Sequence, residues 1–393
     1  MLSNDDAVLH SILQKFRAVL PTDEFLPLHE PLFSGNENKY VQECIDTGWV
    51  SSVGKFVDRF EQDLADYTGV KRAVAVANGT SALHVCLMLV GVKPSDEVIV
   101  PALTFIATAN AVAYCGAIPH FADSAYDTLG LDPDKLADYL REIAAVKDGV
   151  CYNQQTGRRI SAVVPMHTFG HPVDMDKLNA VAEKYHLVVV EDCAESIGSF
   201  YRGKHTGNFG LVAAMSFNGN KTITTGGGGA VLTNDEELGK FAKHLTTQAK
   251  VPHRWEFKHD MVGYNYRMPN LNAALGCAQL EELPDFVKKK RALAARYAKI
   301  FADDTTVDFF TEPDFANSNY WLNVLLLKPQ SAHLRDDLLT LLNDNNIMSR
   351  PVWNLMYTLE MYKAAPRMDC SVAEDIARRL INIPSSVRLG EQK

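Results

Sequence analysis

The sequence lacks the features of a membrane or secreted protein. Its longest apolar runs, such as residues 85–92, are far shorter than the roughly 20 residues that a bilayer-spanning helix needs. The first residues show no basic start followed by an apolar block and a small-residue cleavage site. Internal repeats are also absent. We therefore expect a cytoplasmic protein that has no membrane partner.

The sequence also lacks a cysteine pattern that would indicate a disulfide framework. It contains seven cysteines, an odd and scattered set without a C-x-x-C motif. Reduced thiols in a cytosolic protein explain this set better than disulfides do. The seven are Cys44, Cys86, Cys115, Cys151, Cys193, Cys277 and Cys370.

An excess of positive charge is absent as well. Lysine and arginine number 39 against 48 aspartates and glutamates, which gives a formal net charge of −9. This balance argues against a nucleic-acid partner, because such binding depends on basic residues at phosphates. A small anionic substrate stays possible, since a few local donors can bind a phosphate.

Short apolar runs alternate with helical patterns through the first two thirds of the chain. This alternation predicts an α/β fold with a mainly parallel sheet between helices, and ligands of such sheets bind at the carboxyl ends of the strands. The expected strands are residues 73–77, 97–101, 118–121, 161–166, 187–190, 213–217 and 230–233. The expected helices are residues 80–91, 104–114 and 174–185.

The pattern changes after about residue 267. A long helix is expected over residues 270–301, interrupted at Pro284, followed by a smaller α+β unit. We predict a large domain over residues 1–270, which includes the N-terminal segment, and a small domain over residues 271–393.

The first motif that can carry chemistry is NGTS, residues 78–81, between an expected strand and a buried helix. Gly79 permits a tight turn, and Thr80 and Ser81 offer hydroxyls and free backbone N–H groups at a helix N-terminus, where an anion such as phosphate is favoured. A simple helix cap is the alternative interpretation.

The second motif is LVVVED, residues 187–192, which places Asp192 at the end of an apolar strand. A buried carboxylate is costly without a partner. A protonated pyridine nitrogen would be such a partner, and Asp192 would make that ring an electron sink. Capping of the next element is the alternative.

The third motif is SFNGNKTITTGGGG, residues 216–229, which carries Lys221 in a loop between two expected strands. A lysine that is shielded from water and lies beside another cation can have a lowered pKa and form a Schiff base with an aldehyde. Ser216 lies five residues earlier and could reach a phosphate. The alternative is an ordinary solvated lysine.

These motifs, in this order, resemble those of the DegT/StrS-type sugar aminotransferases, which are fold-type I pyridoxal-phosphate enzymes. The resemblance spans nearly the whole chain. The blocks that carry it are GWVSSVGKFVDRFE, VANGTSALH, DEVIVPALTFIATANAV, VVVEDCAESIGS, SFNGNKTITTGGGG and GYNYRMPNLNAALG.

The resemblance implies pyridoxal 5'-phosphate as cofactor and a role for each matching position. Lys221 would form the Schiff base and move the proton between cofactor and sugar carbon, while Asp192 would pair with the pyridine nitrogen. Phe105 would stack on the cofactor ring, and Glu195 would lie near its ring oxygen, where many members have glutamine. The implied phosphate ligands are Thr80, Ser81 and Ser216.

Asn265, in GYNYRMP, would by the same resemblance reach the phosphate of a neighbouring subunit, which implies a homodimer with shared active sites. One position departs from the family. Many members read TGEGG after the lysine, whereas this chain has Gly227 at the glutamate position.

The implied reaction moves an amino group from L-glutamate to C4 of a nucleotide-linked 4-keto-6-deoxy sugar. The cues PLHEPLFSGNE, GWVSSVGKFVDRFE and GGGG resemble a branch that acts on UDP-2-acetamido-2,6-dideoxy-4-keto-hexoses and gives UDP-4-amino-4,6-dideoxy-N-acetyl-hexosamines. A GDP- or dTDP-linked keto sugar of the perosamine type is the alternative. Two further alternatives are a sugar dehydratase on the same fold and a non-catalytic regulator. Such a dehydratase usually has histidine at the lysine position. Lys221 argues against both alternatives.

Three weaker features favour ordinary structural roles. His167, His171 and Asp174 could suggest a metal site, but Gly170 and Pro172 disfavour one regular helix face, and we expect no metal. Residues 288–291 (KKKR) are expected on a solvated helix face. Residues 353–362 could approach the sugar from the small domain, although their spacing does not require it.

Overall fold

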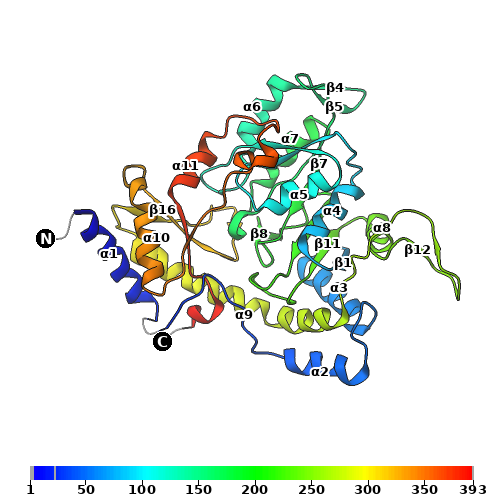
Figure 1. The fold of residues 1–393 in the computed structure, drawn as a ribbon, viewed down its shortest axis with the longest axis horizontal. Coiled ribbons are helices and arrows are strands. Elements are labelled where there is room, and N and C mark those ends of the chain that lie inside the picture. The colour runs from blue at the N-terminus through cyan, green and yellow to red at the C-terminus, as the bar shows by residue number, and fades with distance from the viewer. Residues whose placement is uncertain (1–3, 22–23, 392–393) are drawn as a thin grey trace.

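The computed structural model describes residues 4–21 and 24–391 of the chain. Its centre is a seven-stranded sheet in which β11 runs antiparallel to both neighbours and the other pairs are parallel (Figure 1). This mixed, mostly parallel sheet confirms the predicted α/β class. In spatial order the strands are β1 (Arg72–Val76), β11 (Gly229–Thr233), β10 (Val212–Ser216), β7 (Val188–Asp192), β6 (Ile160–Val163), β2 (Glu97–Pro101) and β3 (Ile118–Ala122).

Helices cover both faces of this sheet, and strand β1 shows why. Val74 and Val76 pack in one buried cluster with α4, whereas Ala73 and Ala75 pack in another with Phe60 of α3 and with α9. Successive side chains of a strand point to opposite faces, so an all-apolar strand requires two covering layers. The helices of this region are α2 (Glu37–Thr47), α3 (Lys55–Thr68), α4 (Gly79–Leu89), α5 (Ile106–Tyr114), α6 (Pro133–Ile143), α7 (Met175–Lys184) and α8 (Glu236–Thr246).

A second, antiparallel sheet forms in the C-terminal third, in the order β14 (Val307–Phe309), β16 (Asn323–Leu327), β18 (Leu380–Ile383) and β17 (Arg350–Pro351). Helices α10 (Arg335–Asp344) and α11 (Ser371–Arg379) belong to the same part of the chain. Helix α1 (Asn4–Val19) packs its apolar side into the cluster of β14, β16 and α10 (Figure 1). The domain boundary at residue 270 stays a prediction.

Three small ribbons complete the fold. A hairpin of β4 (Ala144–Lys147) and β5 (Val150–Asn153) follows α6. Strands β8 (Phe200–Tyr201), β9 (Lys204–His205) and β15 (Ala316–Asn317) form a short sheet. The hairpin of β12 (Lys250–Val251) and β13 (Lys258–His259) projects from the molecule beside α8 (Figure 1).

Helix α9 (Asn270–Phe301) corrects two expectations. It continues through Pro284, because Leu283 and Phe286 on either side of the proline are both buried and hold the helix where one backbone bond is missing. Residues 288–291 are not all solvated. Lys290 is fully buried, since the turn of the helix directs one member of that basic run inward.

The described part of the chain, residues 4–21 and 24–391, contains no helix that is both long and apolar enough to cross a membrane.

Candidate active site

The three sequence motifs meet at one edge of the large sheet. Gly229 pairs with Val76 on one side and with Ser216 on the other, so the ends of β1, β11 and β10 lie together. A side chain at Gly79 would place its Cβ 2.7 Å from that of Ser216. The structure therefore brings the Ser216 hydroxyl beside the first residue of α4, as the phosphate interpretation requires.

The N-terminus of α4 is a capped turn. The side-chain oxygen of Asn78 accepts the Ser81 backbone N–H at 2.8 Å, which caps the helix and fixes its first turn. Thr80 and Ser81 line an open cavity of about 360 Å³, together with His84 and two tyrosines. Hydroxyls and backbone N–H groups at this positive end of the helix dipole are suited to a phosphate. The two tyrosines are Tyr114 and Tyr266.

Asp192 ends β7 as a buried carboxylate. Its oxygens accept the Thr108 hydroxyl at 2.8 Å and the Ala194 backbone N–H at 3.1 Å. Burial raises the pKa of Asp192 even though these donors and the charge of Lys221 act in the opposite direction. Among the described residues it forms no ion pair, so a cationic ring N–H from outside the chain would relieve the cost of burying this charge.

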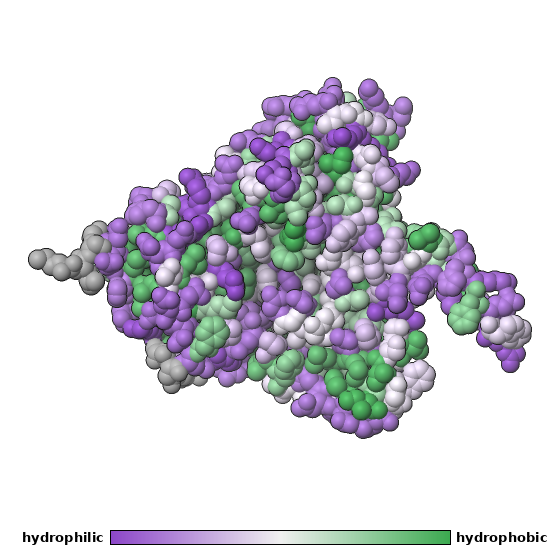
Figure 2. Space-filling model, in the orientation of Figure 1, coloured by the Kyte–Doolittle hydropathy of each residue, from purple (hydrophilic) through white to green (hydrophobic). Residues whose placement is uncertain are grey.

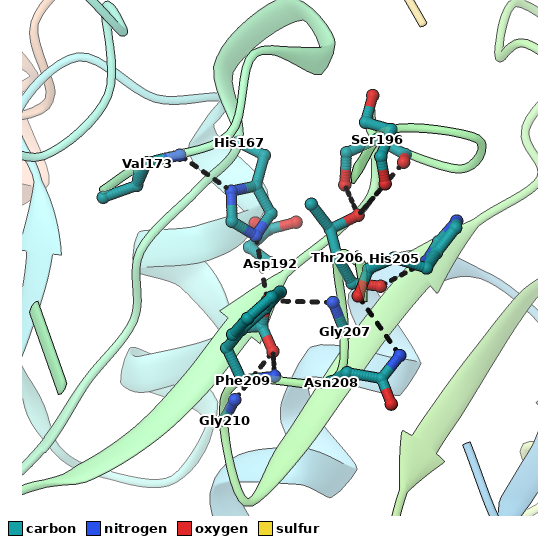
Figure 3. Close-up of polar contacts among 12 residues, drawn as sticks. His167, Val173, Asp192, Ser196, His205, Thr206, Gly207, Asn208, Phe209 and Gly210 are labelled. Carbon is teal, nitrogen blue, oxygen red and sulfur yellow. Dashed lines mark hydrogen bonds and ion pairs between the residues drawn. The ribbon is translucent and has the colours of Figure 1, made fainter. Parts of the chain in front are cut away.

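The neighbouring residue, Glu191, fixes the end of β7 from the opposite face. Its oxygens accept backbone N–H groups of Gly207, Phe209 and Gly210 at 2.6–2.8 Å, as well as the His167 ring at 3.1 Å (Figure 3). The pKa of Glu191 is lowered, because these hydrogen bonds outweigh the opposing effect of burial. We infer that this network holds Asp192 in place.

The same network accounts for His167. Its Nδ1 accepts the Val173 backbone N–H at 3.2 Å, so its Nε2–H points at Glu191. Within residues 4–21 and 24–391, the one grouping with the geometry of potential metal ligands is His167, Glu191 and Cys193. His171 and Asp174 are not part of it. Since Glu191 already accepts four donors, this group is explained by hydrogen bonding.

Lys221 lies beside a buried carboxylate and an indole ring. Its Nζ is 3.3 Å from Glu195 Oε1 and 3.8 Å from the centre of the Trp321 ring. Glu195 Oε2 accepts the Phe169 backbone N–H at 2.8 Å, which orients the carboxyl group. Burial raises the pKa of Glu195 to about 7, although the charge of Lys221 lowers it. The lysine is thus shielded and adjacent to an acid that can change protonation near neutral pH.

A row of aromatic rings extends from the lysine to Phe105. Trp321 stacks on Phe169, whose ring lies 5.0 Å from that of Trp353, and Trp353 meets Phe105 edge to face at 6.3 Å. Phe105 is 49% exposed although it stands among buried residues at the start of α5. Its free ring face is available for stacking. Trp353 belongs to residues 353–362, whose spacing left open whether they approach the sugar.

Asn265 lies on an exposed segment that pairs with Thr247, near the end of α8. The next residue, Tyr266, accepts the Ala77 N–H through its backbone carbonyl and so joins this segment to the end of β1. The Asn265 side chain makes no hydrogen bond to a described residue. Whether it serves a neighbouring subunit stays a prediction.

Several residues of the site were not found from the sequence. Thr108 lies a few residues into a helix and gives no signal by itself. Trp321 and Asn319 come from a part of the chain about one hundred residues after Lys221. The Asn319 amide donates to the Glu195 and Ile197 backbone carbonyls at 2.9 and 2.8 Å. A tryptophan and an asparagine near an apolar strand are equally common in cores and turns, so only the fold reveals their position.

Comparison with known proteins identifies the family. The model of the DegT/DnrJ/EryC1/StrS aminotransferase family matches residues 32–393. The chain belongs to this family. It is a sugar aminotransferase that depends on pyridoxal phosphate.

The relatives agree in sequence and in fold. The chain is 38% identical over 370 residues to a GDP-perosamine synthase of Escherichia coli O157:H7, covering 94% of this chain and 96% of the relative. A GDP-perosamine synthase of Vibrio cholerae is also 38% identical, over 361 residues, with coverage of 92% and 94%. The fold matches the DegT DnrJ EryC1 StrS aminotransferase of Brucella abortus with a TM-score of 0.81 and 28% identity, over 90% of each chain.

A further structural match is Helicobacter pylori PseC, an aminotransferase involved in the biosynthesis of pseudoaminic acid. Its TM-score is 0.83 at 25% identity, over 92% of this chain and 94% of PseC.

The residues present fit the cofactor of this family. Asp192 is a buried carboxylate without a cationic hydrogen-bond partner among the described residues, and Lys221 is a shielded amine in reach of a second acid. A Cβ at Gly79 would lie 2.7 Å from the Ser216 Cβ, so only glycine fits beside that serine at the start of α4. A basic ring nitrogen, an aldehyde and a phosphate match these three features in turn.

Proposed function

We propose that this sugar aminotransferase transfers the amino group of L-glutamate to C4 of a nucleotide-linked 4-keto-6-deoxyhexose, and that a GDP-linked sugar is the first candidate. The observation that carries the choice of nucleotide is the set of GDP-perosamine synthases at 38% identity, each matched over more than nine tenths of this chain. The UDP-linked 2-acetamido sugar that the sequence suggested has no support among these relatives. The perosamine-type alternative is therefore preferred.

The proposed roles follow the geometry. Pyridoxal phosphate supplies an aldehyde and an electron-accepting ring when it is bound. Lys221 Nζ would hold the cofactor through its aldehyde and, once a substrate amine displaces it, would move the proton to and from the reacting carbon. Asp192, whose buried carboxylate accepts the Thr108 hydroxyl, would keep a proton on the ring nitrogen of the bound cofactor. Glu195, within 3.3 Å of Lys221, can accept a proton from that amine.

Three further contacts would hold the cofactor in position. Thr80, Ser81 and Ser216 would bind the phosphate at the N-terminus of α4, and Phe105 would stack on the ring. Gly227 leaves open space where many family members have a glutamate, because a Cβ at this position meets no atom within 4 Å. A role that depends on that glutamate is therefore not assigned to this chain.

The nucleotide is tested with purified protein, L-glutamate and a panel of GDP-, UDP- and dTDP-linked 4-keto-6-deoxy sugars. Mass spectrometry should detect an amino sugar and equimolar 2-oxoglutarate, with the highest kcat/KM for the GDP-linked sugar. Product from the UDP-linked sugar alone would restore the first interpretation of the sequence. No amino sugar from any member of the panel would overturn the proposed substrate class.

We also propose that the active unit is a homodimer. Figure 2 shows apolar side chains gathered over the α2 end of the molecule, where Trp49 and Val53 line a cavity of about 460 Å³. On the projecting β12–β13 hairpin and just after it, Trp255, Phe257 and Val262 are 69–81% exposed. Apolar surface of this kind typically marks an interface between proteins.

A mixing experiment tests whether active sites are shared. Lys221→Ala and Asn265→Ala should each be inactive alone. In a reassembled 1:1 mixture, half of the dimers are mixed and each has one intact site, so about a quarter of the wild-type activity should return. Mixing without recovery, or monomers in sedimentation velocity at assay concentration, would contradict the shared site.

A further inference from the structure

Trp321 is a buried tryptophan whose position is fixed at three points. It is 4% exposed and lies just before β16. Its backbone N–H donates to the Asn319 side-chain oxygen at 2.8 Å, its carbonyl accepts the Ser385 hydroxyl at 2.6 Å, and its indole N–H donates to the Asn220 carbonyl at 2.7 Å. Because both the main chain and the ring are held, the indole keeps one orientation beside the loop that carries Lys221.

The carbonyl of Trp321 has a second donor, the amine of Lys290. Lys290 is fully buried, and its Nζ donates to the Trp321 carbonyl at 3.2 Å and to the Ser385 carbonyl at 2.5 Å. Burial lowers the pKa of Lys290 well below its usual value, and no carboxylate pairs with it among the described residues. An apolar side chain of similar volume often replaces such a buried charged group without loss of stability. The specific effect of Lys290 is to hold Trp321 and the residues after β18 together.

The ring of Trp321 lies against the amine of Lys221. The Nζ atom is 3.8 Å from the ring centre and 3.3 Å from Glu195 Oε1. An ammonium is attracted to the face of an indole ring, and the attraction is stronger where water is excluded. Lys250 gives a comparison, because its Nζ lies 4.0 Å from the ring centre of Phe257, which is 80% exposed. The buried contact at Lys221 is therefore the stronger of the two.

The proposed reaction uses Lys221 as a free amine in both half-reactions. Once a substrate amine has displaced it, Nζ takes the proton from Cα of the amino acid: a C–H bond breaks, an N–H bond forms, and the electron pair left on carbon passes to the cofactor. The N–H bond then breaks as the proton moves on to the cofactor carbon. In the sugar half-reaction the proton travels the opposite way, through Nζ to C4 of the sugar. Between the two transfers the amine is an ammonium, which needs a group that holds it in place.

We propose that Trp321 is a catalytic residue that binds the ammonium of Lys221 between the two proton transfers, and that Lys290 is a positioning residue that holds Trp321 there; this inference rests on the function proposed above. The hydrogen bond from the indole to the Asn220 carbonyl ties the ring to the residue just before the lysine, so the ring and the amine stay together. A side chain without a π face would leave the ammonium less stabilised and would slow the proton transfer.

Single-turnover absorbance with L-glutamate measures the first half-reaction in Trp321→Phe and Trp321→Leu. Phenylalanine keeps a smaller π face, whereas leucine has none. At saturating glutamate the rate constant should fall about 10- to 30-fold in Trp321→Leu and less in Trp321→Phe. Glutamate deuterated at Cα should show an isotope effect at least as large as in wild type, because the slowed step is the proton transfer. An unchanged rate constant, or a fall with a smaller isotope effect, would overturn the catalytic role, since another step would then limit the rate.

Phe301→Leu is the matched control. Phe301 is also a buried ring with a lysine over it, at 5.6 Å from Lys15 Nζ, but it packs against α1 and not at the site. This variant should be less stable, yet its rate constant and isotope effect should equal those of wild type.

Lys290→Met tests the positioning role, and Ser385→Ala, which removes the other donor to the Trp321 carbonyl, is the second variant if the first does not fold. Each should slow the same step and keep the isotope effect. Neither should slow it further in the Trp321→Leu background, because both act through one ring. Losses that multiply in the double variants would refute this role.

Nuclear magnetic resonance supplies a readout that needs neither cofactor nor turnover. In protein labelled with ¹³C at lysine Cε, the signal that Lys221→Ala lacks should be shifted upfield by the ring current of the indole. It should return to the range of the other lysines in Trp321→Leu and stay shifted in Phe301→Leu. An unshifted signal in the wild type would overturn the contact. If borohydride fails to fix the cofactor to Lys221 while the shifted signal is present, the proposed reaction fails but the contact stands.

Discussion

Alanine at Gly229 should damage the turn at residues 78–81 that we propose binds the phosphate, whereas alanine at Gly227 should not. A Cβ at Gly229 would lie 2.5 Å from the Asn78 carbonyl carbon and 2.7 Å from the Gly79 nitrogen, both of which are backbone atoms that cannot rotate away. Adding one methyl group to such a contact typically costs about 1–3 kcal/mol. If this strain displaces the start of α4, the affinity for pyridoxal phosphate should fall about 5- to 150-fold.

The assay is titration of cofactor-free protein with pyridoxal phosphate and with pyridoxal, which lacks the phosphate. Gly229→Ala should lose affinity chiefly for the phosphorylated form and should melt several degrees lower. Gly227→Ala is the control, because its Cβ meets nothing within 4 Å and its backbone has no positive φ. Equal behaviour of the two variants, or an equal loss for pyridoxal, would refute the reasoning.

Three further predictions concern the charged residues of the site. Lys221→Ala should retain the fold but lose turnover and the absorbance band of the covalently held cofactor. Borohydride treatment of the wild type should fix the cofactor to the Lys221 side chain. Normal turnover in the variant would contradict the assignment. Asp192→Asn should still bind the cofactor but turn over on the order of 10²–10³-fold more slowly in steady-state assays, and an unchanged rate would argue against its role at the ring nitrogen. In cofactor-free protein, Glu195 favours its neutral form in the folded state, since its pKa rises from its ordinary value of 4.5 to about 7. The stability that Glu195 contributes is complete below about pH 4.5 and is lost as the pH rises through 7. Glu195→Gln should therefore remove up to about 3 kcal/mol of pH-dependent destabilisation, which urea unfolding at pH 5 and pH 8 would measure. Identical pH profiles for the two proteins would count against this pKa.

The central sheet could be predicted because its strands leave local signals. Strands such as β2 and β7 are continuous apolar runs bounded by turns, and a parallel sheet then places the residues that follow them at one edge. This is why Asp192, Ser216 and the α4 turn were found in sequence order before their proximity was known. Their roles in catalysis stay predictions.

Other parts of the site depend on contacts between distant segments, which local patterns do not encode. Trp321, which lies just before β16 of the second sheet, contacts Lys221, and Thr108 of α5 reaches Asp192 at the end of β7. Lys290 was expected in solvent because charged runs usually are, but it donates to the Trp321 and Ser385 carbonyls. Its burial follows from tertiary packing, which overrides composition.

The side chain of Asn319 has a consequence for how the C-terminal third can move. The Asn319 amide N–H groups donate to two backbone carbonyls of the loop that carries Glu195, and the Asn319 side-chain oxygen accepts the Trp321 backbone N–H at 2.8 Å. A Cβ on Gly170 would lie 1.9 Å from the Asn319 side-chain oxygen, so the loop that carries Gly170 is packed tightly against this side chain. Closure of the C-terminal part as a free lid would have to break these bonds. Opening motions for substrate entry should therefore hinge elsewhere, and hydrogen exchange at Trp321 should be among the slowest in the molecule.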